Sequence, residues 1–156
     1  MAGFKILDLS AGNRAVWFNR KHPLCTYLDI RESVAPDVVC DTTDIPDSVG
    51  KDFDLIVYDP PHMCCGPNSN MAKSYGYWNT ETILKNIKGS GEEAHRISKT
   101  NALMAFKWNN HDIKLERVLS LLPGWEPLFG HQMRNMGGVK NSSQTFWVLL
   151  RRLDLL

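Results

Sequence analysis

The sequence has no run of about 18 apolar residues, roughly the length that suggests a membrane-spanning helix. Its first residues, Met1 to Lys5, lead directly into a strand-like segment and lack the layout of a secretory signal peptide. We therefore expect no membrane association and a cytoplasmic location. Internal repeats, low-complexity tracts and long linkers are also missing, so residues 1–156 are expected to form a single domain.

Patterns typical of metal binding are missing as well. The chain has four cysteines, Cys25, Cys40, Cys64 and Cys65. They form no CxxC pair, and two adjacent cysteines do not easily serve one tetrahedral metal ion. Three histidines lack the spacing of metal ligands: His95, His111 and His131. Free thiols in a reducing compartment and no bound metal are expected.

Glycine is scarce where a dinucleotide site would need it. The turn after the first predicted strand, Asp8 to Asn13, contains a single glycine, Gly12. The G-x-G-x-x-G motif of NAD and FAD sites, which lets a pyrophosphate approach bare backbone, is missing. An acidic residue before a turn of small residues suits instead a cofactor with an amino group and no phosphate.

Short apolar segments alternate with helix-like segments along the chain. The expected strands are 4–9, 24–30, 37–41, 53–58, 102–108, 125–133 and 145–152, and the expected helices are 14–20, 81–99 and 112–122. Gly89-Ser90-Gly91 is a candidate break in the second helix. Such alternation predicts a largely parallel sheet covered on both faces. The last two strands leave no room for a crossover helix and should pair antiparallel, which gives a three-layer α/β fold with about seven strands.

Four aspartates fall at the ends of predicted strands: Asp8, Asp29, Asp41 and Asp59. Sheets of this kind bind ligands at the carboxyl ends of their strands. One aspartate in such a place would be an ordinary turn or capping residue, whereas four along one edge indicate a site. Asp29 is placed to accept hydrogen bonds from a ribose diol.

The net charge of +1 hides an uneven distribution. Residues 31–61 contain eight acidic residues against Arg31 and Lys51, whereas residues 62–156 contain 12 Lys or Arg and seven Asp or Glu, a net of +5. An acidic stretch followed by a basic half suits a cationic cofactor beside an anionic polymer. Scattered solvated charges explain the composition equally well.

The turn Asp8-Leu9-Ser10-Ala11-Gly12-Asn13-Arg14 resembles the first motif, acidic-x-x-x-Gly-x-Gly, of the class I S-adenosylmethionine-dependent methyltransferases. Arg14 stands in place of the last glycine. The resemblance implies a Rossmann-like fold with S-adenosylmethionine (SAM) as cofactor, Asp8 and Gly12 at its methionine end, and Asp29 at its ribose. Asp41 is expected at the adenine amino group, with Ile30 and Ile45 against the ring. The implied cofactor-binding residues are Asp8, Ser10, Gly12, Asp29, Ile30, Asp41 and Asp59.

The tetrapeptide Asp59-Pro60-Pro61-His62 resembles the (Asp/Asn/Ser)-Pro-Pro-(Tyr/Phe/Trp) motif of amino-methyltransferases acting on adenine N6 or cytosine N4. These four residues are the expected catalytic residues. An exocyclic amine conjugated with a ring is a poor nucleophile because its lone pair is delocalised. Hydrogen bonds from the amine to the Asp59 carboxylate and the Pro60 carbonyl favour a tetrahedral nitrogen with its lone pair directed at the methyl carbon. His62 replaces the usual aromatic residue and is expected to stack on the base.

Substrate contacts are expected from two loops and one strand end. The expected substrate-binding residues are Lys73, Tyr75 and Trp78 in the loop 63–79, Lys107 and Trp108 at the end of the strand 102–108, and Arg134 and Lys140 in the loop 134–143. Aromatic, amide and basic side chains together suit single-stranded nucleic acid, because bases stack and phosphates need countercharge. Four further aromatic residues are expected in the core: Trp125, Phe129, Phe146 and Trp147.

The leading interpretation is a methyltransferase acting on adenine N6, or on cytosine N4, in DNA or RNA. Two alternatives stay open. Similar tetrapeptides also serve methylation of protein glutamine, and the departures at Arg14 and His62 suit a cofactor-binding partner subunit without activity. No insert has the size of a target-recognition module, so weak sequence specificity, a structured or single-stranded target, a homodimer or a partner subunit is expected.

Overall fold

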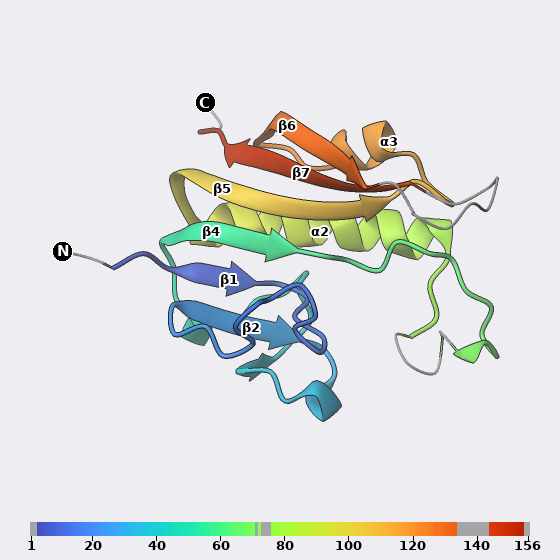
Figure 1. Ribbon diagram of the computed structural model, residues 1–156, viewed down its shortest axis with the longest axis horizontal. Helices are drawn as coiled ribbons and strands as arrows, with labels where there is room; N and C mark the ends of the chain where they lie inside the picture. Colours follow the sequence, from blue (N-terminus) through green and yellow to red (C-terminus); the bar gives the residue numbers. More distant parts are fainter. Residues whose placement is uncertain (1–2, 71, 73–75, 134–143, 155–156) are drawn as a thin grey trace.

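In a computed structural model, the described residues, 3–70, 72, 76–133 and 144–154, form one seven-stranded sheet in the order β3-β2-β1-β4-β5-β7-β6 (Figure 1). The strands are β1 (Ile6–Asp8), β2 (Cys25–Asp29), β3 (Val38–Val39), β4 (Phe53–Tyr58), β5 (Ser98–Asn109), β6 (Trp125–Met133) and β7 (Thr145–Arg152). Strands β1 to β5 pair in parallel, and β7 lies antiparallel between β5 and β6. The mostly parallel α/β fold with an antiparallel last strand is therefore confirmed.

The strand order reverses direction between β1 and β4. From β1 the chain builds outward through β2 and β3, and then returns to add β4 and β5 on the other side of β1. A crevice forms outside the carboxyl ends of the strands at such a switch point, because the connections leave in opposite directions. The fold thus places Asp8 and Asp59, at the ends of the neighbouring strands β1 and β4, beside this crevice.

One long helix, α2 (Thr80–Ile97), covers one face of the sheet (Figure 1). Asn79 caps its first turn: the Asn79 side chain accepts from the Thr82 N–H, and the Thr82 hydroxyl accepts from the Asn79 N–H. Its apolar stripe is buried in the same core cluster as strands β4, β5 and β7. The candidate break at Gly89-Ser90-Gly91 is absent, since the helix runs through these residues and buries Ser90 and Gly91.

The helix expected over 14–20 is wrong, because this segment consists of turns. Arg14 has a left-handed backbone (φ 57°), which cannot continue a right-handed helix. Its guanidinium donates to the Arg20 and Ala35 carbonyls, closing a compact loop. The helix expected over 112–122 is shorter, α3 (Leu115–Leu119), since Asp112 accepts from the Cys64 N–H and lies outside the helix.

The largest fully buried side chains are Trp108, Tyr58, Phe53 and Phe106, which lie where β4 and β5 meet α2. Trp125 is buried as expected, and Phe146 packs against this core. The expectation for Phe129 is wrong: it is 70% exposed, because it lies on the edge strand β6. No helix in the described part of the chain is long and apolar enough to cross a membrane, and the four cysteines are free thiols.

Candidate functional site

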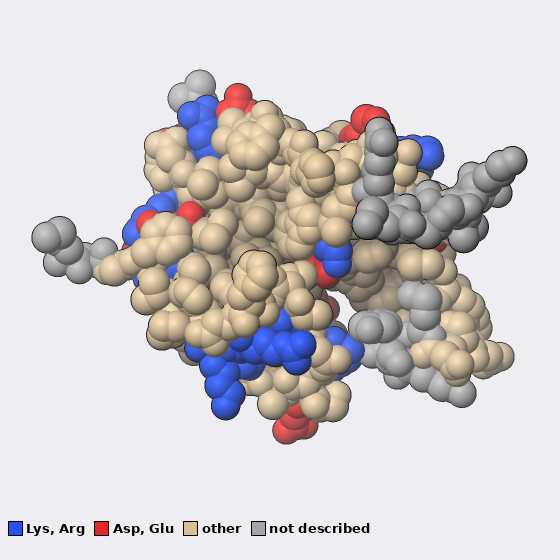
Figure 2. Space-filling view, viewed as in Figure 1, with Lys and Arg blue, Asp and Glu red and all other residues tan. Residues whose placement is uncertain are grey.

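A pocket of about 460 Å³ lies at the carboxyl ends of β1, β2, β4 and β5, where Figure 2 shows the molecule hollowed. All four strand-end aspartates, Asp8, Asp29, Asp41 and Asp59, line it. So do the other expected cofactor residues Ser10, Gly12 and Ile30, and the whole tetrapeptide Asp59-Pro60-Pro61-His62. The two motifs noted in the sequence therefore share one pocket, and its volume lies in the range of small-molecule sites.

Asp8 carries the most perturbed carboxyl group of the pocket. Its side chain is buried and accepts hydrogen bonds from the Ser10 N–H (3.2 Å) and the Trp17 indole N–H (2.7 Å). Burial, helped by the negative charges of Asp59 and Asp29, raises the pKa of Asp8 to about 6 despite these hydrogen bonds. A buried carboxylate of this kind is suited to pairing with a cationic group of a ligand.

Asp29 is held by four donors from Gly12 and Arg31. The Gly12 N–H donates at 2.8 Å, and Arg31 donates through its backbone N–H (2.9 Å), its Nε (3.0 Å) and its Nη2 (3.2 Å). Burial alone would raise the pKa of Asp29, but these hydrogen bonds and the Arg31 charge hold it below its ordinary value. Gly12 has a φ of 50°, and a Cβ there would lie 3.3 Å from the Arg31 guanidinium, so both conformation and space favour glycine.

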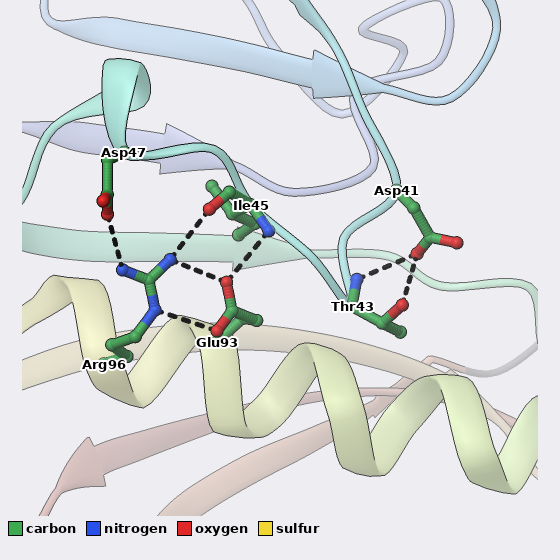
Figure 3. Close-up of polar contacts among 6 residues, drawn as sticks. All are labelled: Asp41, Thr43, Ile45, Asp47, Glu93 and Arg96. Atoms are coloured by element: carbon green, nitrogen blue, oxygen red, sulfur yellow. Dashed lines mark hydrogen bonds and ion pairs between the residues drawn. The ribbon is translucent and has the colours of Figure 1, made fainter.

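Asp41 lies at the far side of the pocket in the connection from β3 to β4. One carboxylate oxygen accepts from the Thr43 N–H (2.9 Å) and hydroxyl (2.8 Å), which fixes the side chain (Figure 3). The same connection is tied to α2, where Glu93 accepts from the Ile45 N–H and Arg96 donates to the Ile45 carbonyl (Figure 3). Ile45 is therefore buried in the core and does not line the pocket, so its expected contact with an adenine ring is wrong.

Asp59 is positioned from both sides. Its backbone N–H donates to the Ser10 hydroxyl (3.0 Å), which joins the first turn to the tetrapeptide. Its carboxylate oxygen Oδ2 accepts from the Lys107 ammonium group at 2.7 Å, and both side chains are about a quarter exposed. Lys107 thus lines the pocket as a partner of Asp59.

His62 folds back over its own tetrapeptide. Its ring nitrogen Nδ1 lies 3.1 Å from the Pro60 carbonyl oxygen and 4.0 Å from a carboxylate oxygen of Asp59. Since a carbonyl oxygen only accepts, Nδ1 carries the proton in this contact. The ring also makes an edge contact with Trp108, at 6.1 Å between ring centroids. His62 therefore stands at the pocket wall on a fixed aromatic support.

The expected substrate residues have different outcomes. Trp78 and Lys107 line the pocket. The expectation that Trp108 walls the pocket is wrong, because its side chain is fully buried and donates to the Ile113 carbonyl. Neighbouring residues of a strand point to opposite faces, so Lys107 and Trp108 do not both reach the pocket. Lys73, Tyr75, Arg134 and Lys140 lie outside the described residues.

Several lining residues were not expected from the sequence, among them Arg31, Thr42, Met63, Cys65 and Asn86. Asn86 comes from α2 and accepts from the Tyr58 hydroxyl at 3.2 Å. Arg31 follows the strand-end pair Asp29-Ile30 directly, so its closeness to Asp29 was a usable signal. Among the described residues no group of three or more His, Cys, Asp or Glu side chains is arranged to hold a metal ion.

Comparison of the sequence with protein families and with curated proteins gives no match. Comparison of the structure with solved structures finds methyltransferases. The chain is similar to N-methyltransferase NodS from Bradyrhizobium japonicum WM9 in complex with S-adenosyl-L-homocysteine, with a TM-score of 0.66, 12% identity, and coverage of 97% of this chain and 79% of that one.

Two further structures have a similar fold, and one of them is named as an rRNA methylase. TrmN from Thermus thermophilus has a TM-score of 0.61 and 16% identity over 97% of this chain and 44% of its own. An rRNA methylase from Streptococcus thermophilus has a TM-score of 0.58 and 10% identity over 97% of this chain and 88% of its own. The chain therefore has the Rossmann-like fold of SAM-dependent methyltransferases.

Proposed function

We propose that this protein is a SAM-dependent methyltransferase that methylates an exocyclic amino group of a nucleic-acid base, adenine N6 foremost. The observation that carries the proposal is the shared pocket. The strand-end aspartates expected at a cofactor and the tetrapeptide expected at an amine line the same 460 Å³ cavity. Fold similarity supports the cofactor class, and the tetrapeptide supports the amine.

The pocket fits SAM by the chemistry of its groups. Asp8 offers a buried carboxylate to the cofactor's ammonium group, and Asp29 lies where the ribose hydroxyls are expected. Ile30 is 64% exposed at the pocket wall and offers an apolar surface to the adenine ring, with Asp41 and Thr42 beside it. When bound, SAM supplies an electrophilic methyl group on a sulfonium ion.

The tetrapeptide suits the task of holding the amine. Lys107 occupies one oxygen of the Asp59 carboxylate, and the other oxygen, Oδ1, stays available to the amine N–H. The Pro60 carbonyl has two lone pairs, of which the His62 ring takes one. Two hydrogen bonds from the amine then draw its nitrogen toward tetrahedral geometry. Pro60 and Pro61 provide no competing N–H donors.

Two further observations favour nucleic acid as the acceptor. Residues 62–156 carry a net charge of +5, which suits a polyanion. One of the structurally similar proteins is named as an rRNA methylase. We therefore place DNA and RNA bases ahead of protein glutamine as acceptors.

The test is methyl transfer from tritium-labelled SAM to separate DNA, RNA and protein pools. The proposal expects label in a nucleic-acid pool, lost in Asp59→Ala and partly kept in Asp59→Asn, since asparagine still offers an oxygen acceptor. Label only in protein would favour the glutamine alternative. Binding of SAM without transfer to any pool would favour a partner subunit and contradict the proposal.

A further inference from the structure

The connection from β1 to β2 displays an aromatic ring with no cover. Phe18 is fully exposed, and the residues that follow it, Asn19, Arg20 and Lys21, are exposed as well. A large apolar side chain in water carries a cost that burial against a partner would remove. Val16, two residues earlier, lines the pocket, so the exposed ring stands close to the rim of the site.

The loop that carries Phe18 is held in place by contacts with Asp8 and Tyr27. The Trp17 indole N–H donates to the Asp8 carboxylate at 2.7 Å, and its ring contacts Tyr27 edge-on at 5.5 Å between centroids. The Arg14 guanidinium lies over the Tyr27 ring at 4.1 Å from its centroid and donates to the Arg20 carbonyl. Because inward contacts hold this backbone, ordering Phe18 and Arg20 on a partner costs little further entropy.

The charge of this connection is of one sign. No Asp or Glu occurs between Asp8 and Asp29, whereas Arg14, Arg20 and Lys21 all lie there. Figure 2 shows Lys and Arg side chains gathered over the β1–β2 part of the molecule, below an uncharged area over the sheet. An exposed ring followed by cations, in a connection that contains no acidic residue, is a combination that suits single-stranded nucleic acid, since rings stack on bases and cations pair with phosphates.

We propose that Phe18, Arg20 and Lys21 form a strand-docking surface at the rim of the pocket, with Phe18 stacking on a base and the two cations contacting phosphates. The substrate class rests on the proposed function. The surface binds the strand next to the target nucleotide, because Gly12, Asn13, Ala15 and Val16 of the same loop line the pocket.

The test is fluorescence anisotropy of labelled single-stranded DNA and RNA oligonucleotides with the full chain. Phe18→Ala is expected to weaken binding about tenfold, as for the loss of one stacked base. The double variant Arg20→Ala/Lys21→Ala is expected to reduce the slope of log K against log salt by about 1.4, for two phosphates. Two controls remove the same groups elsewhere: Phe129→Ala on β6, and Lys85→Ala/Lys88→Ala on the exposed side of α2.

Equal effects of the test and control variants would overturn the docking surface. The docking surface would also be overturned if Phe18→Ala kept its oligonucleotide affinity but lost binding to anionic lipid vesicles. The same holds if the variant kept that affinity but lost self-association in sedimentation. Methyl transfer to nucleic acid with wild-type strand affinity in Phe18→Ala would overturn this inference and leave the proposed function standing. Absence of strand binding together with transfer only to protein would overturn both.

Discussion

Asp8 connects the proposed cofactor end of the pocket to the loop that follows β1. Its buried carboxylate accepts from the Trp17 indole, so the group expected to meet the cofactor also anchors the loop that carries Phe18. A carboxyl group with a raised pKa must be ionised to bind a cation. The ionisation of Asp8 therefore makes both the cofactor affinity and the free energy of unfolding depend on pH, and the two quantities change in opposite directions.

Cofactor affinity is predicted to fall as the pH is lowered through about 6, the raised pKa of Asp8. Below it the carboxyl group is protonated and affinity drops by up to about tenfold per pH unit. Calorimetric titration with SAM between pH 5 and 8 measures this. Asp8→Asn should bind weakly with this pH dependence removed, and an unchanged profile in that variant would contradict the role of Asp8.

The free energy of unfolding is predicted to respond in the other direction. The Asp8 carboxyl group has a pKa of 3.8 as its ordinary value and about 6 in the folded chain. Between these values the unfolded state binds fewer protons than the folded state, so the free energy of unfolding falls as the pH rises. Asp8→Asn should lack this decline and be more stable than the native chain at pH 8. Urea unfolding at several pH values tests it, and a less stable variant at pH 8 would count against the assignment.

Lys107 is predicted to position Asp59. Lys107→Met should lower kcat about 10- to 100-fold by freeing the Asp59 side chain, with SAM affinity nearly unchanged. Lys99→Met is a matched control, because Lys99 is paired with Asp54 at 2.6 Å on the same strand but does not line the pocket. Both pairs are partly buried, so the two variants remove comparable ion pairs. Equal kcat values in the two variants would contradict a positioning role for Lys107.

At the scale of single residues, the sequence predicts pocket-lining residues best where a residue ends a strand. Asp8, Asp29 and Asp59 end strands in the structure or follow them directly, and parallel strands bring their carboxyl ends to one edge. The sequence-based prediction was wrong where a residue's role depends on which face of the strand it occupies. Met104, Phe106 and Trp108 alternate as buried residues, and that alternation assigns Trp108 to the core and Lys107 to the opposite face.

Among the elements, α2 shows why a glycine pair does not break a helix. A Cβ on Gly91 would lie 2.5 Å from Leu122 Cδ2, and the Gly91 carbonyl accepts from the buried Trp125 indole. These contacts let the segment before β6 lie close against α2. Packing therefore outweighs the weak helix propensity of glycine, which is about 1 kcal/mol per residue.

Gly91→Ala is predicted to destabilise the protein even though alanine favours a helix. Leu122 is 2% exposed and must shift within a packed core, so overpacking of about 1–3 kcal/mol is expected to exceed the gain of propensity. Denaturant unfolding measures the change. Gly66→Ala is the control, because a Cβ there meets nothing within 4 Å. A Gly91→Ala variant as stable as Gly66→Ala would contradict this packing.

The elements also show where a periodic pattern misleads. The strands 53–58, 125–133 and 145–152 have the bounds predicted, since apolar runs between turn signals define them. The segment 14–20 is not helical, because Trp17 and Arg14 make tertiary contacts with Asp8 and Tyr27 that a helix would not allow. Such contacts join residues distant in sequence, and local pattern does not report them.

At the scale of the whole molecule, the switch in strand order determines where the pocket lies, and the distribution of charge determines which charged residues line it. The acidic segment 31–61 supplies Asp41 and Asp59, and the basic remainder supplies Lys107. The first turn provides one glycine rather than three, so a dinucleotide lacks its phosphate site. The pocket is thus expected to select a cationic nucleoside ligand.

SAM is therefore predicted to stabilise the whole domain against heat, and NAD is not. At a concentration 100 times its Kd, a ligand that binds only the folded state adds about 2.7 kcal/mol. Thermal unfolding with SAM, S-adenosylhomocysteine and NAD measures the shift. Asp29→Ala should reduce the shift with SAM, and stabilisation by NAD equal to that by SAM would contradict the selectivity.

Nucleoside analysis of the methylated nucleic acid tests most directly which atom receives the methyl group. We predict an N6-methyladenine or N4-methylcytosine nucleoside by mass spectrometry, absent from the Asp59→Ala reaction. Methylation at a ring nitrogen or a ribose oxygen, or an exocyclic product that persists in Asp59→Ala, would contradict it.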